Sequence, residues 1–191
     1  MTDPPEVPYV ESGMLLAAWP DLLDPNFMHR VVLICQHRPE GAFGLVTNQR
    51  TEVTLGDLFP DHEGLAGADF PVFCGGPVDA SSLHFVHRAP DEITGGLLIS
   101  EGLWLGGELD SLAGFVGKHG LSAYDRLRVF VGYSGWGAGQ LDLELIAGSW
   151  VPAPPSVERT FAEPGESAWR LVVRSVDSGD LSQQPPDASW N

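Results

Sequence analysis

Apolar positions recur along this chain with two different periods, and each period predicts one kind of element. Continuous or alternating runs of Val, Leu, Ile and Phe are typical of strands buried in a sheet. Such runs cover residues 14–19, 31–36, 42–47, 71–75, 83–88 and 127–133, with shorter candidates at 97–100 and 103–105. Because the turn Pro39-Glu40-Gly41 separates the second run from the third, we expect residues 31–47 to form a hairpin.

A helical period is found in two longer segments. Residues 109–119 and 166–176 carry apolar side chains at i, i+3, i+4 and i+7, which predicts two amphipathic helices. Gly120 follows the first segment and is suited to end a helix. Thr54 and Asp57 resemble a capping box that opens a short helix. Strands and helices do not alternate regularly, so the pattern favours an α+β fold over a doubly wound α/β fold.

Residues 127–150 read LRVFVGYSGWGAGQLDLELIAGSW and are the most distinctive part of the chain. Their first part predicts a central strand, which runs into four glycines with Trp136 among them. The residues after Gln140 fit two structures. Leucines alternate with acids as in a strand, whereas Leu141, Leu145 and Ile146 share one face of a helix. Periodicity leaves both structures open.

Length and composition predict one domain with loose ends. The 191 residues can bury a sizeable core, which we place in residues 13–176. Residues 1–12 are proline-rich and acidic, which predicts a flexible arm, and residues 177–191 contain no Lys or Arg, which predicts a disordered tail. The start of the chain lacks the features of a signal peptide, and no apolar run approaches the ~20 residues of a membrane span. We therefore expect a cytoplasmic protein.

The charge balance narrows the range of partners. The chain has 26 acidic residues against 10 basic ones, a net charge of -16, and Lys118 is its only lysine. DNA would be repelled by such a field, so direct nucleic-acid binding is not expected. The expected partners are proteins or small ligands. Cys35 and Cys74 lie in apolar runs and are expected to be buried, reduced thiols.

The glycines after the central strand are candidates for an anion-binding loop. Backbone amides at Gly135, Gly137 and Gly139 would lead into a helix N-terminus, as in phosphate sites. Their spacing does not match G-x-G-x-x-G, no Gly-Lys-Ser/Thr follows, and acids at positions 142 and 144 would repel phosphate. The favoured interpretation is that these glycines let the chain turn sharply, and no cofactor is expected.

A cysteine and a histidine form the second candidate site. Cys35 and His37 lie two residues apart on a predicted strand, so they are expected to share a face. With an acid nearby they could form an activated thiol. A buried thiol beside an edge histidine is the commoner arrangement.

The spacing of residues argues against two further kinds of site. His29, His37 and His87 could converge with Asp24 on a metal, but no closely spaced histidine pair supports this, and no metal site is predicted. Ser134 lies in Gly-Tyr-Ser-Gly-Trp, which lacks the final glycine of the G-x-S-x-G nucleophile elbow. A hydrolase is therefore not favoured.

Several blocks in order resemble the bacterial YqgE/AlgH family. They read GMLLAAWPDLLDPNF, VVLICQH, GAFGLVTNQ, FCGGPV, LHFVHR and GYSGWGAGQLDLEL, followed by SW and by AW in the last helix. The resemblance implies an α+β fold with a strongly coiled, branching, mostly antiparallel sheet flanked by a few helices. It also implies a helix over residues 140–147. Because the resemblance places cysteine at position 35 in other members, Cys35 is the strongest single candidate for reactivity. Some members carry the label of transcriptional regulator.

The chain shows no complete catalytic constellation, so an enzyme is not favoured. The leading hypothesis is a cytosolic, non-catalytic binding or regulatory protein that acts through protein or small-ligand contacts. One alternative is a thiol-based enzyme or redox sensor that uses Cys35. Another is a transcriptional regulator that acts indirectly rather than by touching DNA.

Overall fold

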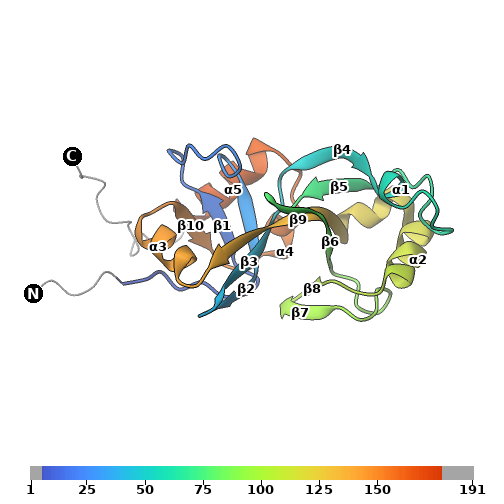
Figure 1. The fold of residues 1–191 in the computed structure, drawn as a ribbon, viewed down its shortest axis with the longest axis horizontal. Helices are drawn as coiled ribbons and strands as arrows, with labels where there is room; N and C mark the ends of the chain where they lie inside the picture. Colours follow the sequence, from blue (N-terminus) through green and yellow to red (C-terminus); the bar gives the residue numbers. More distant parts are fainter. Residues whose placement is uncertain (1–5, 178–191) are drawn as a thin grey trace, which may run out of the picture.

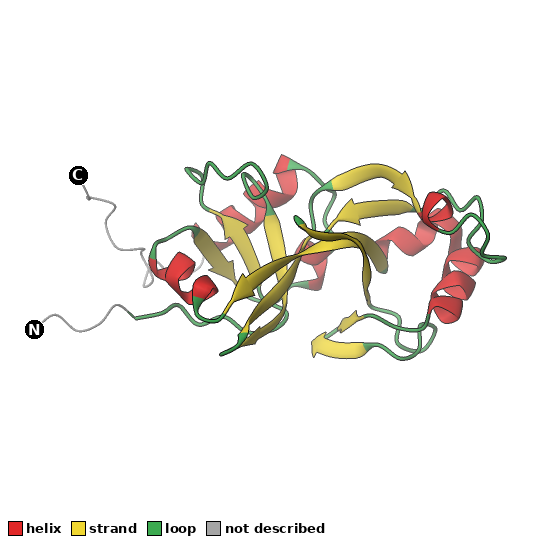
Figure 2. Cartoon of the chain, in the orientation of Figure 1, coloured by secondary structure: helices red, strands yellow, loops and turns green. Residues whose placement is uncertain are grey.

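The computed structural model describes residues 6–177 of the chain, and within them the fold is α+β, as the sequence pattern predicts. Ten strands form one sheet, and helices lie at both ends of the molecule (Figure 1, Figure 2). The strands are β1 (Leu15–Ala18), β2 (Val31–Arg38), β3 (Gly41–Val46), β4 (Arg50–Thr54), β5 (Pro71–Cys74), β6 (Val78–His87), β7 (Leu97–Ser100), β8 (Leu103–Leu105), β9 (Leu127–Gly137) and β10 (Trp150–Ala153). The helices are α1 (Leu55–Leu58), α2 (Leu109–His119), α3 (Gln140–Ile146), α4 (Val157–Thr160) and α5 (Glu166–Asp177), with a 3₁₀ turn at Gly120–Asp125.

Strand β9 is the branch point of the sheet. The main path runs β10-β1-β2-β3-β9-β6-β8-β7, and β5 joins β9 from outside this path while also pairing with β4. The first half of β9 pairs with β5 in parallel and with β6 antiparallel, whereas its last residues pair with β3. One edge of β9 therefore changes partner along its length. This produces the branched, mostly antiparallel sheet that the family resemblance implies.

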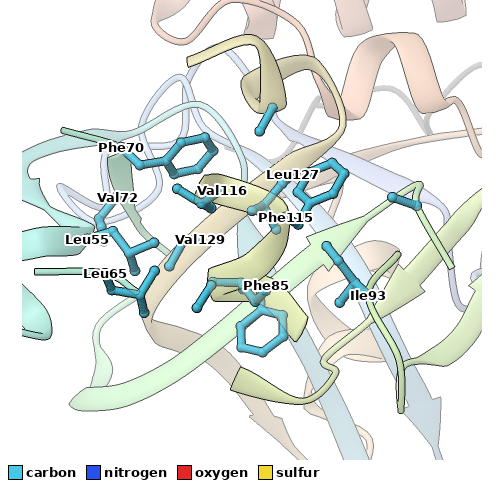
Figure 3. Close-up of a cluster of buried hydrophobic side chains, with 14 residues drawn as sticks. Leu55, Leu65, Phe70, Val72, Phe85, Ile93, Phe115, Val116, Leu127 and Val129 are labelled. Atoms are coloured by element: carbon cyan, nitrogen blue, oxygen red, sulfur yellow. The ribbon is translucent and has the colours of Figure 1, made fainter. Parts of the chain in front are cut away.

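Three clusters of buried side chains hold the sheet to its helices. The first lies between α2 and strands β5, β6 and β9, where Phe85, Phe115 and Val129 meet (Figure 3). The second lies on the opposite side of the sheet and includes Trp169 of α5. The third lies under α3 and includes Trp136. Strand β2 contributes to the second and third clusters by alternation, so its apolar run is buried on both faces.

The short local signals of the sequence are confirmed. Strands β2 and β3 form the expected hairpin. At the start of α1, Thr54 Oγ1 accepts a hydrogen bond from the Asp57 N–H at 3.2 Å, and Asp57 Oδ2 accepts one from the Thr54 N–H at 2.8 Å. Helix α2 ends at Gly120, whose φ is 56°. Residues 140–146 are helical, which decides the ambiguity that periodicity left open.

Two strand boundaries differ from the sequence-based expectation. Strand β9 continues to Gly137, so the glycine-rich segment expected as a loop is largely strand, held by pairing with β3. Residues 150–153 are not among the predicted strands, yet they form β10, in which Pro152 lies opposite Leu16 of β1. Strand β10 is at the end of the sheet path, and an edge strand tolerates proline because one side of its backbone needs no partner.

The described ends of the chain bear on the predicted arm and tail. Val10 is buried, and its carbonyl oxygen lies 2.9 Å from His37 Nδ1, so this part of the expected arm packs on the sheet. Residues 1–5 and 178–191 of the predicted arm and tail lie outside the described residues. Among residues 6–177, no helix combines the length and apolar character needed to cross a bilayer.

Candidate functional site

A β-bulge separates the two residues of the predicted thiol site. The pairing of β2 with β3 shifts between Ile34 and Gln36, so Cys35 is the extra residue. Its side chain lies in the second core cluster, whereas His37 contacts α3 on the other face of the sheet. The expectation that these two side chains share a face is therefore wrong. An extra residue cannot be seen in the sequence of one strand, because it is defined by the pairing with another.

The two side chains have different surroundings. Burial strongly raises the pKa of the Cys35 thiol, and its Sγ lies 3.7 Å from the Leu33 carbonyl oxygen. The His37 ring bridges Val10 and Asp142, with Nε2 at 3.2 Å from Asp142 Oδ1. His37 thus ties β2 to the N-terminal segment and to α3. The thiol needs a lower pKa to ionise near neutral pH, and burial works against this.

The glycines proposed as an anion-binding loop make contacts within the fold instead. Gly135 and Gly137 lie within β9, opposite Phe43 and Gly41 of β3. The Gly137 N–H donates to Gln140 Oε1 at 3.0 Å, and Gly139 caps α3 with a φ of 69°. Helix α3 has seven residues, too short to supply a helix-dipole anion site of its own. These glycines thus serve the strand pairing and the start of α3.

The histidines considered as metal ligands have different neighbours in the fold. His29 packs against Trp169, and His87 is buried beside Trp104. Within residues 6–177, no three His, Cys, Asp or Glu side chains are grouped so that they could hold a metal ion.

The structure instead brings together three half-buried rings from three strands. We call Phe43 of β3, His84 of β6 and Tyr133 of β9 the aromatic cluster. Ring centroids are 5.1 Å apart for Phe43 and His84, 5.3 Å for Phe43 and Tyr133, and 5.7 Å for His84 and Tyr133. These spacings are those of favourable aromatic pairs. The three residues are far apart in the sequence, and only the topology of the sheet unites them.

Tightly packed glycines shape the backbone beneath the aromatic cluster. A Cβ at Gly76 would lie 2.4 Å from the Tyr133 carbonyl, and one at Gly75 would lie 2.3 Å from the Gly132 carbonyl oxygen. Gly76 and Gly132 also have positive φ angles of 151° and 69°. Only glycine fits such a close crossing of two chain segments. The turn after β5 thus fixes the position of Tyr133.

A bulged segment of β6 supplies polar groups at the rim of the aromatic cluster. The pairing of β6 with β9 shifts between Val78 and Leu83, and Asp79 has a φ of 43°. Ser82 Oγ lies 3.1 Å from His84 Nε2 and donates to the Asp79 carbonyl oxygen at 2.8 Å. Burial lowers the pKa of His84, although the nearby Asp79 charge opposes this shift. A neutral imidazole beside a hydroxyl can accept a hydrogen bond from a ligand or donate one to it.

Two other features of the structure lack the properties of a binding site. Arg128 is fully buried, its guanidinium lies 4.1 Å from the Tyr124 ring centroid, and its Nη2 donates to the Phe161 carbonyl oxygen at 2.8 Å. It joins β9 to α4 and is inaccessible. A hollow of about 660 Å³ lies between residues 61–64 and α2, and its walls are mainly glycine, alanine and carboxylate, with His62 as the one aromatic ring among its lining residues. Neither feature offers the aromatic surface of the cluster.

Comparisons with known proteins agree on one family. A model described as AlgH-like matches residues 15–179. A UPF0301 protein of Chlorobaculum tepidum is 36% identical to this chain over 170 residues, which cover 89% of each chain. A UPF0301 protein of Chlamydia trachomatis serovar L2b is 36% identical over 175 residues, which cover 90% of each chain. The solution structure of the AlgH protein from Pseudomonas aeruginosa matches with a TM-score of 0.68 at 27% identity, covering 94% of this chain and 95% of that one. A crystal structure of a Corynebacterium diphtheriae protein matches with a TM-score of 0.70 at 25% identity, covering 95% and 91%.

Proposed function

This chain belongs to the AlgH-like family. From its geometry we propose that it is a non-catalytic binding or regulatory protein of the cytoplasm that acts through contacts with a protein or a small ligand. The observation that carries the proposal is the aromatic cluster of Phe43, His84 and Tyr133. Half-buried aromatic side chains with a polar rim are typical of binding sites. Cys35 and Cys74 are free thiols, which suits a reducing compartment.

The rim of the aromatic cluster favours binding over catalysis. A serine nucleophile needs a base that takes its proton and an acid that orients the base. Here the Ser82 hydroxyl donates to the Asp79 carbonyl oxygen, and the Asp79 carboxylate accepts from Ser81. Among the described residues, no carboxylate oxygen is hydrogen-bonded to the His84 ring. The pair can therefore recognise a polar group, but it lacks the arrangement that activates a serine.

The charge supports protein or small-ligand partners over nucleic acid. Any effect on transcription would then pass through a partner rather than through DNA contacts. With fluorescently labelled duplex DNA at low salt, we expect no rise in anisotropy at micromolar protein. Tight, salt-sensitive binding would contradict this part of the proposal.

Photo-crosslinking tests the proposed site directly. Tyr133 is replaced by benzoylphenylalanine in the full chain, and cells are irradiated. We expect one or more defined adducts, whereas the same replacement at the exposed Tyr9 should not give them. The adducts should weaken when the crosslinker is placed at Tyr133 in a His84→Ala chain. Equal labelling from both positions would refute the aromatic cluster as the site, and hydrolysis of p-nitrophenyl acetate that is lost in Ser82→Ala would refute the non-catalytic role.

A further inference from the structure

The outer edge of the sheet carries an unusual apolar strand. Strand β7 ends the sheet path, and among the described residues it pairs with β8 alone. Leu97 and Leu98 of this strand are 70% and 63% exposed. Figure 1 shows the β7–β8 hairpin along the lower edge of the molecule, and the turn of this hairpin packs against α4, since a Cβ at Gly102 would lie 3.1 Å from Val157 Cγ2. An exposed apolar edge strand is a ready template for pairing with another chain.

The two leucines project to opposite faces of the hairpin. Leu97 lies opposite Leu105 of β8, which packs on the second core cluster, and Leu98 lies opposite Trp104. Neighbouring strand residues point to opposite faces, so both faces of this strand offer an apolar side chain. The far end of β7 is covered, because a Cβ at Gly13 would lie 2.3 Å from the Ser100 Cβ. The free part of the edge is therefore the half that contains the two leucines.

The charged residues of the hairpin and its flanks are all acidic. Residues 94–108 contain Glu101 and Glu108 and no Lys, Arg or His. Glu101 is exposed in the turn of the hairpin, and Glu108 is exposed beside Gly95, just before β7. The carboxylates thus lie at both ends of the apolar edge. A partner that covers the leucines gains from positive charge on either side.

We propose that β7 captures an extended, positively charged apolar segment of a partner protein by adding it to the sheet as a further strand. This inference rests on the proposed binding function and gives it a partner class. Main-chain hydrogen bonds along β7 would provide affinity, and Leu97 and Leu98 would each select an apolar side chain on one face of the added strand. A second copy of this chain fits less well, because pairing two such edges brings together like-charged ends of chains that each carry -16.

The test uses the full chain and a short capped peptide with a central run of valines and lysines at both ends. Binding is followed by NMR titration and by hydrogen exchange of the β7 amides. We expect exchange of the β7 amides that point away from β8 to slow by about tenfold or more at saturating peptide. Leu98→Lys should weaken binding about tenfold, a loss of about 1.4 kcal/mol, whereas Leu143→Lys should not. Leu143 is 69% exposed on α3, so the control adds the same charge at an equally exposed leucine.

Two altered peptides separate the contributions to binding. Methylation of alternate backbone nitrogens should abolish binding, and replacement of lysine by glutamate should weaken it strongly. Unchanged affinity of the methylated peptide, or of Leu98→Lys, would overturn strand addition. Self-association of the chain that is lost in Leu98→Lys would overturn it in favour of a second copy. If the β7 amides stay unprotected from hydrogen exchange while position 133 still crosslinks, this inference fails and the proposed function stands. Protection of the β7 amides without crosslinking at position 133 supports strand addition and refutes the aromatic cluster as the site.

Discussion

Trp136 and Trp150 donate their indole N–H groups to the same carboxylate oxygen, Oε2 of Glu144, each at 2.8 Å. The two rings also meet edge to face, with centroids 6.0 Å apart. Trp136 comes from β9 and Trp150 from β10, strands that lie well apart along the sheet path. A single acid on α3 therefore joins two distant strands under the third core cluster.

Loss of this acid should destabilise the fold. Glu144→Ala leaves two largely buried indole N–H groups without their acceptor, and we expect a loss of about 2–4 kcal/mol in the free energy of unfolding. Glu144→Gln keeps an amide oxygen in place and should cost less. Urea denaturation followed by tryptophan fluorescence measures both. Glu52→Ala, at an exposed position on β4, is the matched control, and an equal loss there would refute the proposed linkage.

Two glycine substitutions should have opposite effects. Gly76→Ala places a methyl group 2.4 Å from the Tyr133 carbonyl at a positive φ, so we expect a loss of about 2 kcal/mol or more. Gly114→Ala on the exposed face of α2 meets nothing within 4 Å and should stabilise the protein by about 0.5–1 kcal/mol through helix propensity. Thermal or urea unfolding distinguishes them. A neutral Gly76→Ala would mean that the turn after β5 is not rigid.

The acid stability of the protein should depend on Glu92. This carboxylate contacts Lys118 Nζ and Arg126 Nη2 at 2.7 Å and His119 Nε2 at 2.8 Å, and these hydrogen bonds lower its pKa to about 2. A carboxylate whose pKa is lower in the folded state than in the unfolded state stabilises the protein at pH values above its ordinary pKa. This stabilisation is lost as the pH falls toward the pKa of the folded state. The stability of the wild type should therefore fall between about pH 4.5 and pH 2. Glu92→Gln should flatten this fall in urea titrations, and an unchanged slope would contradict it.

The two cysteines should differ in reactivity. Cys35 is buried and burial raises the pKa of its thiol, whereas Cys74 is half-buried at the end of β5. Under native conditions iodoacetamide should modify Cys74 well before Cys35, and both should react after unfolding. Mass spectrometry of peptides from briefly treated protein gives the two rates. Rapid alkylation of native Cys35 would support the thiol-based alternative instead.

Local sequence signals predicted the elements better than their arrangement. The capping pair Thr54 and Asp57, the stop at Gly120 and the apolar period of residues 166–176 each act within a few residues, so the sequence displays them directly. The helix after Gln140 needed the family resemblance, because its leucines fit two periods equally well. The strand at residues 150–153 was missed because Pro152 is tolerated only through its place at the sheet edge.

The candidate site depended on pairing between strands, and this could not be read from one sequence. The bulge at Cys35 removes it from the face of His37, and it exists only relative to β3. Likewise Phe43, His84 and Tyr133 come from strands that the order of the sheet brings together. Aromatic residues in predicted strands gave a hint, but each fits a core position equally well.

The branching of the sheet at β9 has a consequence for how relatives of this chain can differ in length. Three strands take their alignment from this one segment, and neighbouring residues in it face opposite cores. A single amino acid inserted between Val129 and Ser134 would turn each following side chain to the opposite face of the sheet. It would also shift the register of β9 with more than one neighbouring strand. Insertions and deletions among homologues should therefore collect in the loops around residues 61–69 and avoid residues 127–137.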